Sequence, residues 1–349
     1  MRVLASVLGA ILALPLLLLA SLGLRVGYSP SGWVMVAAAA LVVAGALLAP
    51  LRASRARRWP LAWAGLALFA LVVTTRLIFA GYGRTTMTTL PGGGSRWLAR
   101  VLDEEDPCLV GALALTRRWS FLPFAPFAER DELVPAMHDA YVSMRASEGV
   151  TPSPVLDTFL GRQRPEAFDA LVVEPRAGAP KGAVVFLHGY AGSFTLECWM
   201  MAEAARAIDA LTVCPATGFD GRWWTAEGER TLRATLAYVA KRGIARPYLA
   251  GLSNGGIGAS RLAPRFASSL AGLVLVSGAS PDGSSAGLPT LVVQGDHDTN
   301  VSTATVRAFA ARNHATYAGF EGGHFVMMER RAEVRERIAG WLVKVSGGR

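Results

Sequence analysis

The stretch Gly251-Leu252-Ser253-Asn254-Gly255-Gly256 decides how the rest of the chain is interpreted. It follows the short apolar run Tyr248-Leu249-Ala250 and precedes a segment of small residues that is compatible with a helix. A G-x-S-x-G pattern between a strand and a helix is typical of a sharp turn that exposes a serine hydroxyl as a nucleophile. Glycines flank the serine because such a strained turn leaves no room for larger side chains. The pattern predicts Ser253 as a nucleophile, and the alternative is an ordinary glycine-rich turn.

Regularly spaced apolar runs surround this turn from residue 168 onward. We expect strands at 170–173, 183–187, 211–214, 248–250, 273–276 and 290–293, with a weaker one at 316–320. Helix-compatible segments lie between most of them, at about 195–207, 227–242, 255–266, 302–312 and 328–345. Strands that alternate with helices predict an α/β fold, in which a mostly parallel sheet is covered by helices on both faces.

Two loops after the later strands carry the residue types that a nucleophilic serine needs. Strand 290–293 is followed by Gln294-Gly295-Asp296-His297-Asp298, and strand 316–320 by Glu321-Gly322-Gly323-His324. Because sites in parallel sheets form at the carboxyl ends of the strands, we expect Ser253, an aspartate and His324 to meet at one edge. Ser253 would attack a carbonyl carbon, His324 would carry the proton, and the aspartate would orient the imidazole.

These motifs resemble those of the α/β-hydrolase family. The resemblance rests on the serine turn, on the two loops above and on His188-Gly189 after an apolar strand, and it covers about residues 165–346. The serine turn is also similar to that of dienelactone hydrolases, polyester depolymerases, feruloyl esterases and prolyl-oligopeptidase-like peptidases. Family members usually place the acid last in a Gly-x-x-Asp turn, so the resemblance favours Asp298 over Asp296, which would stabilise the turn.

The same resemblance implies where a negatively charged intermediate would be stabilised. The backbone N–H groups of Asn254 and of Tyr190, which follows His188-Gly189, are expected to form the oxyanion hole. His188 itself is expected to bond to nearby backbone. Many family members insert a helical cap where only residues 278–288 separate two strands here, so the site is expected to lie open unless residues 84–165 or the membrane surface cover it.

Aromatic residues follow the strand that ends at Cys214. Phe219, Trp223 and Trp224 lie after it, on the edge of the sheet predicted for Ser253. We expect Trp223 and Trp224 to bind substrate as part of an apolar wall, and the alternative is aromatic packing within a loop.

The N-terminal quarter of the chain differs in composition from the rest. Residues 1–83 contain seven arginines and no Asp or Glu, so most of the formal net charge of +9 lies there. Three apolar stretches, at 3–24, 33–51 and 60–80, are each about long enough to cross a bilayer as a helix. The basic charge therefore belongs to a membrane segment and gives no support for nucleic-acid binding. A cleaved signal peptide is the alternative for the first stretch, whose apolar run is longer than usual for one.

The arginines also predict an orientation. Arg52, Arg55, Arg57 and Arg58 lie between the second and third stretches, whereas the first connection holds only Arg25. Positive residues stay on the cytoplasmic side, so everything after about residue 83 is expected in the periplasm or outside the cell. Arg76, near the end of the third stretch, would have to snorkel to the interface.

The chain is thus expected to have three parts: three transmembrane helices in residues 1–83, a linker and N-terminal extension in 84–165, and an α/β-hydrolase catalytic domain in 166–349. Cys108, Cys198 and Cys214 do not form an even set, so buried free thiols are favoured over pairing of Cys198 with Cys214. No Cys/His spacing resembles a metal site, and no cofactor is expected.

These patterns together predict a membrane-anchored serine hydrolase that cleaves carboxylic esters through an acyl-enzyme intermediate. Its substrate would be a small-molecule or lipid-like ester. A serine peptidase or an acyltransferase would use the same three residues. A non-catalytic binding protein of the same fold is disfavoured because Ser253, Asp298 and His324 are all present.

Overall fold

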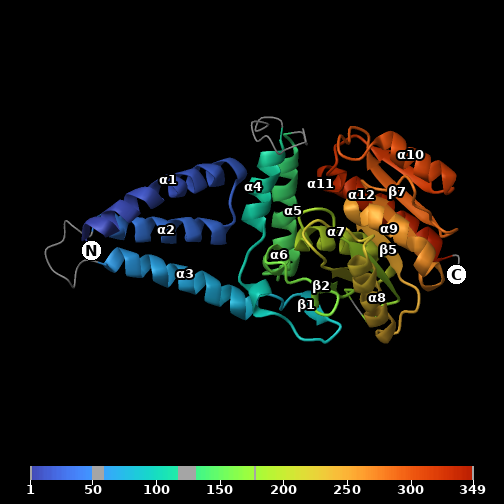
Figure 1. Ribbon diagram of the computed structural model, residues 1–349, viewed down its shortest axis with the longest axis horizontal. Helices are drawn as coiled ribbons and strands as arrows, with labels where there is room; N and C mark the ends of the chain where they lie inside the picture. Colours follow the sequence, from blue (N-terminus) through green and yellow to red (C-terminus); the bar gives the residue numbers. More distant parts are fainter. Residues whose placement is uncertain (1, 49–58, 117–130, 177, 348–349) are drawn as a thin grey trace.

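The computed structural model describes residues 2–48, 59–116, 131–176 and 178–347, and it consists of a three-helix part, an intermediate part and a sheet domain (Figure 1). The sheet has eight strands in the order β1-β2-β4-β3-β5-β6-β7-β8. Strands β3 to β8 are parallel to one another, whereas β2 is antiparallel to both β1 and β4. The strands are β1 (Thr85–Leu90), β2 (Phe168–Val173), β3 (Gly182–Leu187), β4 (Ala210–Pro215), β5 (Tyr248–Leu252), β6 (Gly272–Val276), β7 (Thr290–Gly295) and β8 (Thr316–Phe320).

Helices cover both faces of this sheet. Side chains of α7, α11 and α12 form one buried cluster against it, and those of α8, α9 and α10 form the other. Five of the strands are buried at every residue, which is why they read as unbroken apolar runs in the sequence. The predicted α/β fold is confirmed, with element ends shifted by at most two residues and the last helix divided at Arg330. The helices are α7 (Thr195–Ala205), α8 (Ala226–Lys241), α9 (Asn254–Phe266), α10 (Thr303–Arg312), α11 (Val326–Glu329) and α12 (Arg331–Ser346).

The intermediate part, predicted as a linker and extension, contributes a strand to the sheet. β1 pairs with β2 from Thr85 opposite Val173 to Leu90 opposite Phe168, so this segment holds an edge strand that the sequence analysis did not predict. The strand was missed because its sequence, TTMTTL, contains two apolar residues and its middle is only half-buried, as suits an edge strand. The other elements of this part are η3 (Trp97–Arg100), α4 (Glu105–Leu115), α5 (Leu133–Glu148) and α6 (Val155–Phe159).

The helices α1 (Arg2–Val26), α2 (Pro30–Leu48) and α3 (Pro60–Phe79) project from the sheet domain (Figure 1). Each is long and apolar enough to cross a membrane. Small residues allow α2 and α3 to pack closely, because a side chain at Gly65 would collide with the backbone of Ala38. The arginines at positions 52–58 lie outside the described residues.

Polar contacts join one end of this three-helix part to the intermediate part. Arg76, in the last turn of α3, lies 2.9 Å from the Asp103 carboxylate and donates hydrogen bonds to the carbonyls of Leu102 and Thr151. Its side chain is buried against these partners, and its position relative to the membrane interface stays a prediction. Ser29, in the connection between α1 and α2, donates to the Asp106 carboxylate. The sheet domain is therefore held at the end of the helices opposite to the C-terminal end of α2 and the N-terminal end of α3.

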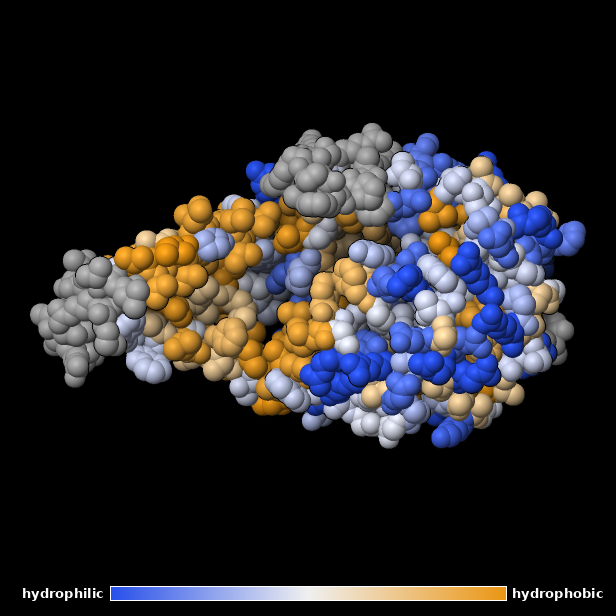
Figure 2. Space-filling model, viewed as in Figure 1, coloured by the Kyte–Doolittle hydropathy of each residue, from blue (hydrophilic) through white to orange (hydrophobic). Residues whose placement is uncertain are grey.

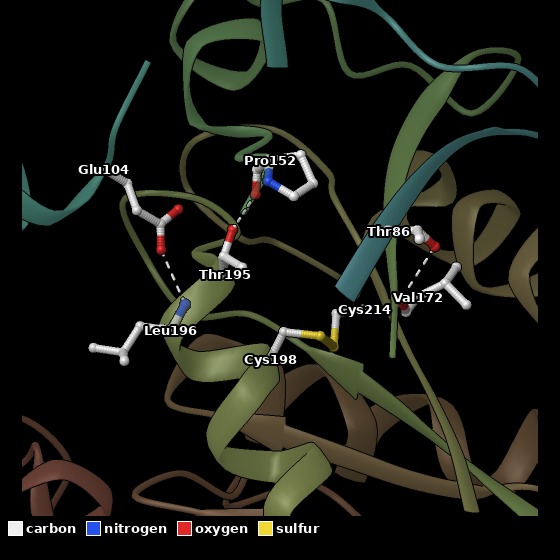
Figure 3. The surroundings of a disulfide bond; sticks show 8 residues. All are labelled: Thr86, Glu104, Pro152, Val172, Thr195, Leu196, Cys198 and Cys214. Atoms are coloured by element: carbon white, nitrogen blue, oxygen red, sulfur yellow. Dashed lines mark hydrogen bonds between the residues drawn. A yellow bond between two sulfur atoms is a disulfide. The ribbon is translucent and has the colours of Figure 1, made fainter. Parts of the chain in front are cut away.

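A disulfide joins Cys198 in α7 to Cys214 in β4, with 5.9 Å between their Cα atoms (Figure 3). The prediction of buried free thiols is therefore wrong for this pair, and Cys108 is the free cysteine among the described residues. The pairing depends on α7 packing along β4, which no spacing in the sequence reveals. An odd number of cysteines excludes a complete framework but not a single bond.

Removing this disulfide is expected to lower the free energy of unfolding by about 3 kcal/mol, because the bond closes a loop with a sequence separation of 16 residues. The measurement is thermal or urea unfolding of the full chain in detergent, comparing wild type with a variant that combines Cys198→Ala and Cys214→Ala. Cys108→Ala serves as the control and should cost about 1 kcal/mol or less. Equal losses in the two proteins would contradict the expectation.

Two buried glutamates meet where the intermediate part packs against α7. The Glu104 carboxylate accepts a hydrogen bond from the Leu196 N–H at the start of α7 (Figure 3). It also accepts from the hydroxyls of Ser153 and Tyr141. Burial raises the pKa of Glu104, and burial together with the Glu104 charge raises the pKa of Glu197 to about 8. One oxygen of Glu197 has no hydrogen-bond partner among the described residues. The folded chain therefore holds Glu197 in its neutral form near pH 7.

We expect Glu197→Gln to make the protein more stable than wild type at alkaline pH. The folded state keeps the Glu197 proton up to about pH 8, whereas the unfolded chain loses it near pH 4.5, so stability falls as the pH rises between these values. The full loss over this range is roughly 5 kcal/mol, and the glutamine variant should avoid it. Thermal midpoints at pH 5 and pH 8.5 test this, with the exposed Glu227→Gln as control. A difference that does not depend on pH would refute the assignment.

Candidate active site

Ser253 lies in the turn between β5 and α9. Its backbone angles are φ 54° and ψ −119°, a strained conformation for a residue with a side chain. The turn is tight because an added side chain at Gly255 would collide with the carbonyl oxygen of Leu187, and one at Gly251 would collide with Gly255. The glycines of the G-x-S-x-G pattern are therefore required by close backbone contacts, as the sequence predicts.

The structure brings Ser253 and His324 together. His324 follows β8, and its Nε2 lies 2.9 Å from the Ser253 hydroxyl oxygen. Its Nδ1 lies 2.9 Å from an oxygen of Asp298. Because a carboxylate can only accept, Nδ1 carries the proton and donates it, which leaves Nε2 as the acceptor for the serine hydroxyl. This arrangement can remove the hydroxyl proton when the oxygen attacks.

Asp298 is fixed by further donors. One of its oxygens accepts from the Gln294 side-chain amide at 2.7 Å, and the other accepts from the N–H groups of Asn300 and Val301 at 2.8 and 2.9 Å. Its side chain is fully buried, so these bonds replace the water that a carboxylate would otherwise need. Asp296 instead extends to the Arg307 guanidinium at 3.1 Å on the surface. The structure thus places Asp298, and not Asp296, against His324.

The two predicted oxyanion donors flank the serine. Asn254 is the first residue of α9, and its side chain donates to the Asp220 carbonyl at 2.8 Å. Gly189 packs against Ser253, since an added Cβ there would lie 3.1 Å from the serine Cβ, and Tyr190 follows it. Within the described residues, neither the Asn254 nor the Tyr190 N–H has a hydrogen-bond acceptor. Both N–H groups therefore remain available to a ligand.

Four features decide the architecture. They are the order of the strands in the sheet, the antiparallel β2, the serine turn after β5, and the chain order Ser253, Asp298, His324. The chain has the α/β-hydrolase fold. No protein-family model matches the sequence, and no curated protein is similar to it at a significant level. Its sheet domain is similar to solved structures of α/β serine hydrolases and esterases.

Three of these structures describe the similarity. Est1E of Butyrivibrio proteoclasticus, solved with ferulic acid, is 16% identical over 52% of this chain and 96% of its own, with a TM-score of 0.44. A lidless α/β serine hydrolase of Xanthomonas campestris is 19% identical over 51% and 89%, with a TM-score of 0.41. A thermophilic esterase of Thermogutta terrifontis is 18% identical over 52% and 99%, with a TM-score of 0.41.

His188 supports the α/β-hydrolase site through the backbone, as the sequence predicts. Its Nδ1 lies 2.8 Å from the Gly189 carbonyl, and its Nε2 accepts from the Thr217 N–H at 3.0 Å. Burial lowers the pKa of His188 to about 4, so the ring is neutral and Nδ1 is the donor. These bonds fix the loop that carries Tyr190.

Trp223 does not line the site, so the expectation that it binds substrate is wrong. Its ring is fully buried among core residues, and its indole N–H donates to the His188 carbonyl at 2.9 Å. Trp224 is half-buried beneath the Arg261 guanidinium, 5.5 Å from the ring centre, and its contact with a substrate stays a prediction.

A different set of aromatic side chains lies beside Tyr190. The ring of Phe219 is 4.9 Å from that of Tyr190 and also 4.9 Å from that of Phe159 in α6. Phe159 was missed because residue 159 falls in the segment predicted as an extension, and no periodic pattern connects it with the serine turn. The intermediate part therefore reaches the edge of the sheet where Ser253 lies.

Proposed function

We propose that the protein is a membrane-anchored serine hydrolase that cleaves carboxylic esters. The observation that carries the proposal is the continuous hydrogen-bond chain from the Ser253 hydroxyl through His324 to the buried Asp298 carboxylate. The strained backbone of Ser253 and the two unpaired N–H groups beside it support the same conclusion.

The reaction would proceed through an acyl-enzyme. The Ser253 oxygen attacks the ester carbonyl while His324 Nε2 takes its proton, and Asp298 stabilises the imidazolium that forms. The N–H groups of Asn254 and Tyr190 would hold the oxyanion. His324 then protonates the departing alcohol, and a water molecule activated by the same nitrogen releases the acid.

The surroundings of Ser253 favour an ester with an apolar acyl or aryl group. The rings of Tyr190, Phe219 and Phe159 form a contiguous aromatic cluster next to the predicted oxyanion donors. Residues 278–288 form no helix in the structure, so no cap rises from that loop. A cap from that loop therefore does not stand between Ser253 and a bulky apolar substrate.

We also propose that the catalytic domain lies outside the cytoplasm. The C-terminal end of α2 and the N-terminal end of α3 are remote from the sheet domain, and the arginines that follow α2 in the sequence place these two ends on the cytoplasmic side by the positive-inside rule. The buried Cys198–Cys214 disulfide agrees independently, because such bonds persist in oxidising compartments. A reporter fused after Arg349 should be active only outside the cytoplasm, and cytoplasmic activity would overturn this orientation.

The catalytic proposal is tested with a fluorophosphonate probe, which labels activated serines. The full chain in detergent should be labelled, Ser253→Ala should not, and the control Ser346→Ala on α12 should be labelled like wild type. Turnover of p-nitrophenyl esters against aminoacyl anilides then separates an esterase from a peptidase. Absence of labelling in wild type, or labelling that persists in Ser253→Ala, would exclude the proposed nucleophile.

A further inference from the structure

We propose that the ester substrate is a lipid-like acyl ester taken from the surface of the bilayer, and that an apolar face leads from the three-helix part to Ser253. This inference rests on the proposed function. The apolar face consists of five side chains that are each more than half exposed: Tyr82, Trp97, Phe159, Leu160 and Tyr190. They come from four segments that are distant in sequence, of which η3 packs against both α3 and α6, and Phe219 links Phe159 to Tyr190.

The first step of the path runs from the end of α3 to α6. The Gly81 N–H donates to the Val150 carbonyl at 3.1 Å, and Arg76 donates to the Thr151 carbonyl at 3.1 Å. Ser153 then donates its N–H to the Ala99 carbonyl of η3 at 2.8 Å, and α6 begins two residues later. The helix α6 is therefore held directly against the point at which α3 leaves the predicted membrane.

Two exposed aromatic side chains mark that point. Tyr82 lies three residues after the end of α3, and Trp97 begins η3, which packs against α6. Tyr and Trp side chains are enriched where a membrane protein meets the headgroup region, because their rings are apolar and their tips are polar. Their exposure here is explained if the bilayer surface covers this side of the molecule.

The second step of the path runs from α6 to the nucleophile. Thr158 packs against Gly192, where an added Cβ would lie 2.9 Å from the threonine methyl group. Phe159 contacts Phe219, and Phe219 contacts Tyr190. Tyr190 follows the residue whose backbone packs on Ser253. An acyl chain that lies along α6 and these rings would therefore bring its ester carbonyl toward the serine.

The distribution of apolar side chains on the surface indicates that the bilayer covers this apolar face. Apolar side chains continue from the three helices across the junction with the sheet domain, whereas the remote part of that domain shows mostly polar side chains in the same view (Figure 2). An exposed apolar patch of several large residues marks a contact surface, and this one is continuous with helices that suit a membrane. The substrate class follows, because an ester that reaches Ser253 by this path must partition into the headgroup and acyl region.

Two measurements on the full chain in phosphatidylcholine vesicles test the inference. The first compares hydrolysis of p-nitrophenyl acetate, added in water, with hydrolysis of a fluorogenic long-chain diacylglycerol ester carried in the vesicle. The combined variant Trp97→Ser with Leu160→Ser should lower the ratio of vesicle to soluble activity at least about five-fold. Val343→Ser, a half-exposed apolar position near the remote C-terminus, is the matched control and should leave that ratio unchanged.

The second measurement does not depend on activity. A fluorophore attached to Leu160→Cys should be quenched by a nitroxide-bearing lipid in the vesicle, whereas the same fluorophore on Val343→Cys should not. Burial raises the pKa of the Cys108 thiol well above its usual range, so this native cysteine should label slowly.

The outcomes separate this inference from the proposed function. Loss of fluorophosphonate labelling at Ser253 would remove both. Three other outcomes would overturn the bilayer route and leave the hydrolase proposal intact. They are normal labelling with hydrolysis of the soluble ester alone, equal losses of both activities in the combined variant, and no quenching at position 160.

Discussion

Replacing His324 by alanine is expected to lower kcat for an ester substrate by about 10⁶-fold. The imidazole is the only base within hydrogen-bond distance of the Ser253 oxygen among the described residues, at 2.9 Å, so its loss leaves the hydroxyl protonated during attack. The fold should survive, because Asp298 keeps its bonds from Gln294, Asn300 and Val301. Single-turnover kinetics with a p-nitrophenyl ester, together with a thermal unfolding curve, measure both effects.

His297→Ala provides the matched control for this expectation. His297 is exposed in the turn before Asp298, and within the described residues its side chain makes no hydrogen bond or ion pair with Ser253, Asp298 or His324. Its removal should change kcat by less than about two-fold. If His324→Ala retained a tenth of wild-type activity, or if His297→Ala fell equally far, the base would have to be another group.

The proposed site was predictable because it depends on short motifs placed after strands. Ser253, Asp298 and His324 each follow the carboxyl end of a parallel strand, and strand order brings these three ends to one edge. Only the strands had to be recognised in the sequence, and buried parallel strands are recognisable because they appear as apolar runs. Even β8, whose residues are partly exposed, was detectable because it precedes the glycines before His324.

The features that were missed depend on contacts between segments remote in sequence. Trp223 and Trp224 are adjacent aromatic residues, yet one is a core residue that bonds to His188 and the other is half-buried under Arg261. Nothing in their order distinguishes them. The edge strand β1 lacks the apolar alternation that marks a strand, because both its faces are only partly covered.

The intermediate part shows the same limit on a larger scale. Its Pro and Gly residues led to the prediction of an irregular linker. In the structure, buried charged side chains hold the intermediate part in place. Glu148 accepts hydrogen bonds from the backbone and hydroxyl of Thr85 and from Arg206, and Arg76 joins α3 to the residues before α6. Such partners are specified only by the folded arrangement. Their consequence is that the orientation of the sheet domain relative to the three helices is fixed by bonds, which the proposed route from the bilayer requires.

Asp298→Asn is expected to lower kcat by about 10⁴-fold while KM changes little. The asparagine oxygen can still accept from Asn300 and Val301, and the Gln294 amide, whose own oxygen has no partner within the described residues, can turn that oxygen toward the new NH2 group, so the loop should keep its conformation. Its amide nitrogen, however, would donate toward His324 Nδ1 and favour the tautomer that carries a proton on Nε2. That nitrogen would then present a donor to the Ser253 hydroxyl and could no longer accept its proton.

Asp296→Asn is the matched control, because it tests which aspartate of the turn orients His324. Asp296 and Asp298 stand two residues apart in one turn, but Asp296 contacts Arg307 on the surface and not His324. Asp296→Asn should therefore alter kcat by less than about two-fold, because only a partly exposed ion pair is lost. The pH profile of kcat/KM for both variants provides a second readout, since only Asp298→Asn removes the charge that stabilises the imidazolium. If Asp296→Asn were the more damaging variant, the acid of the turn would be misassigned, and the buried bonds of Asp298 would have only a structural role.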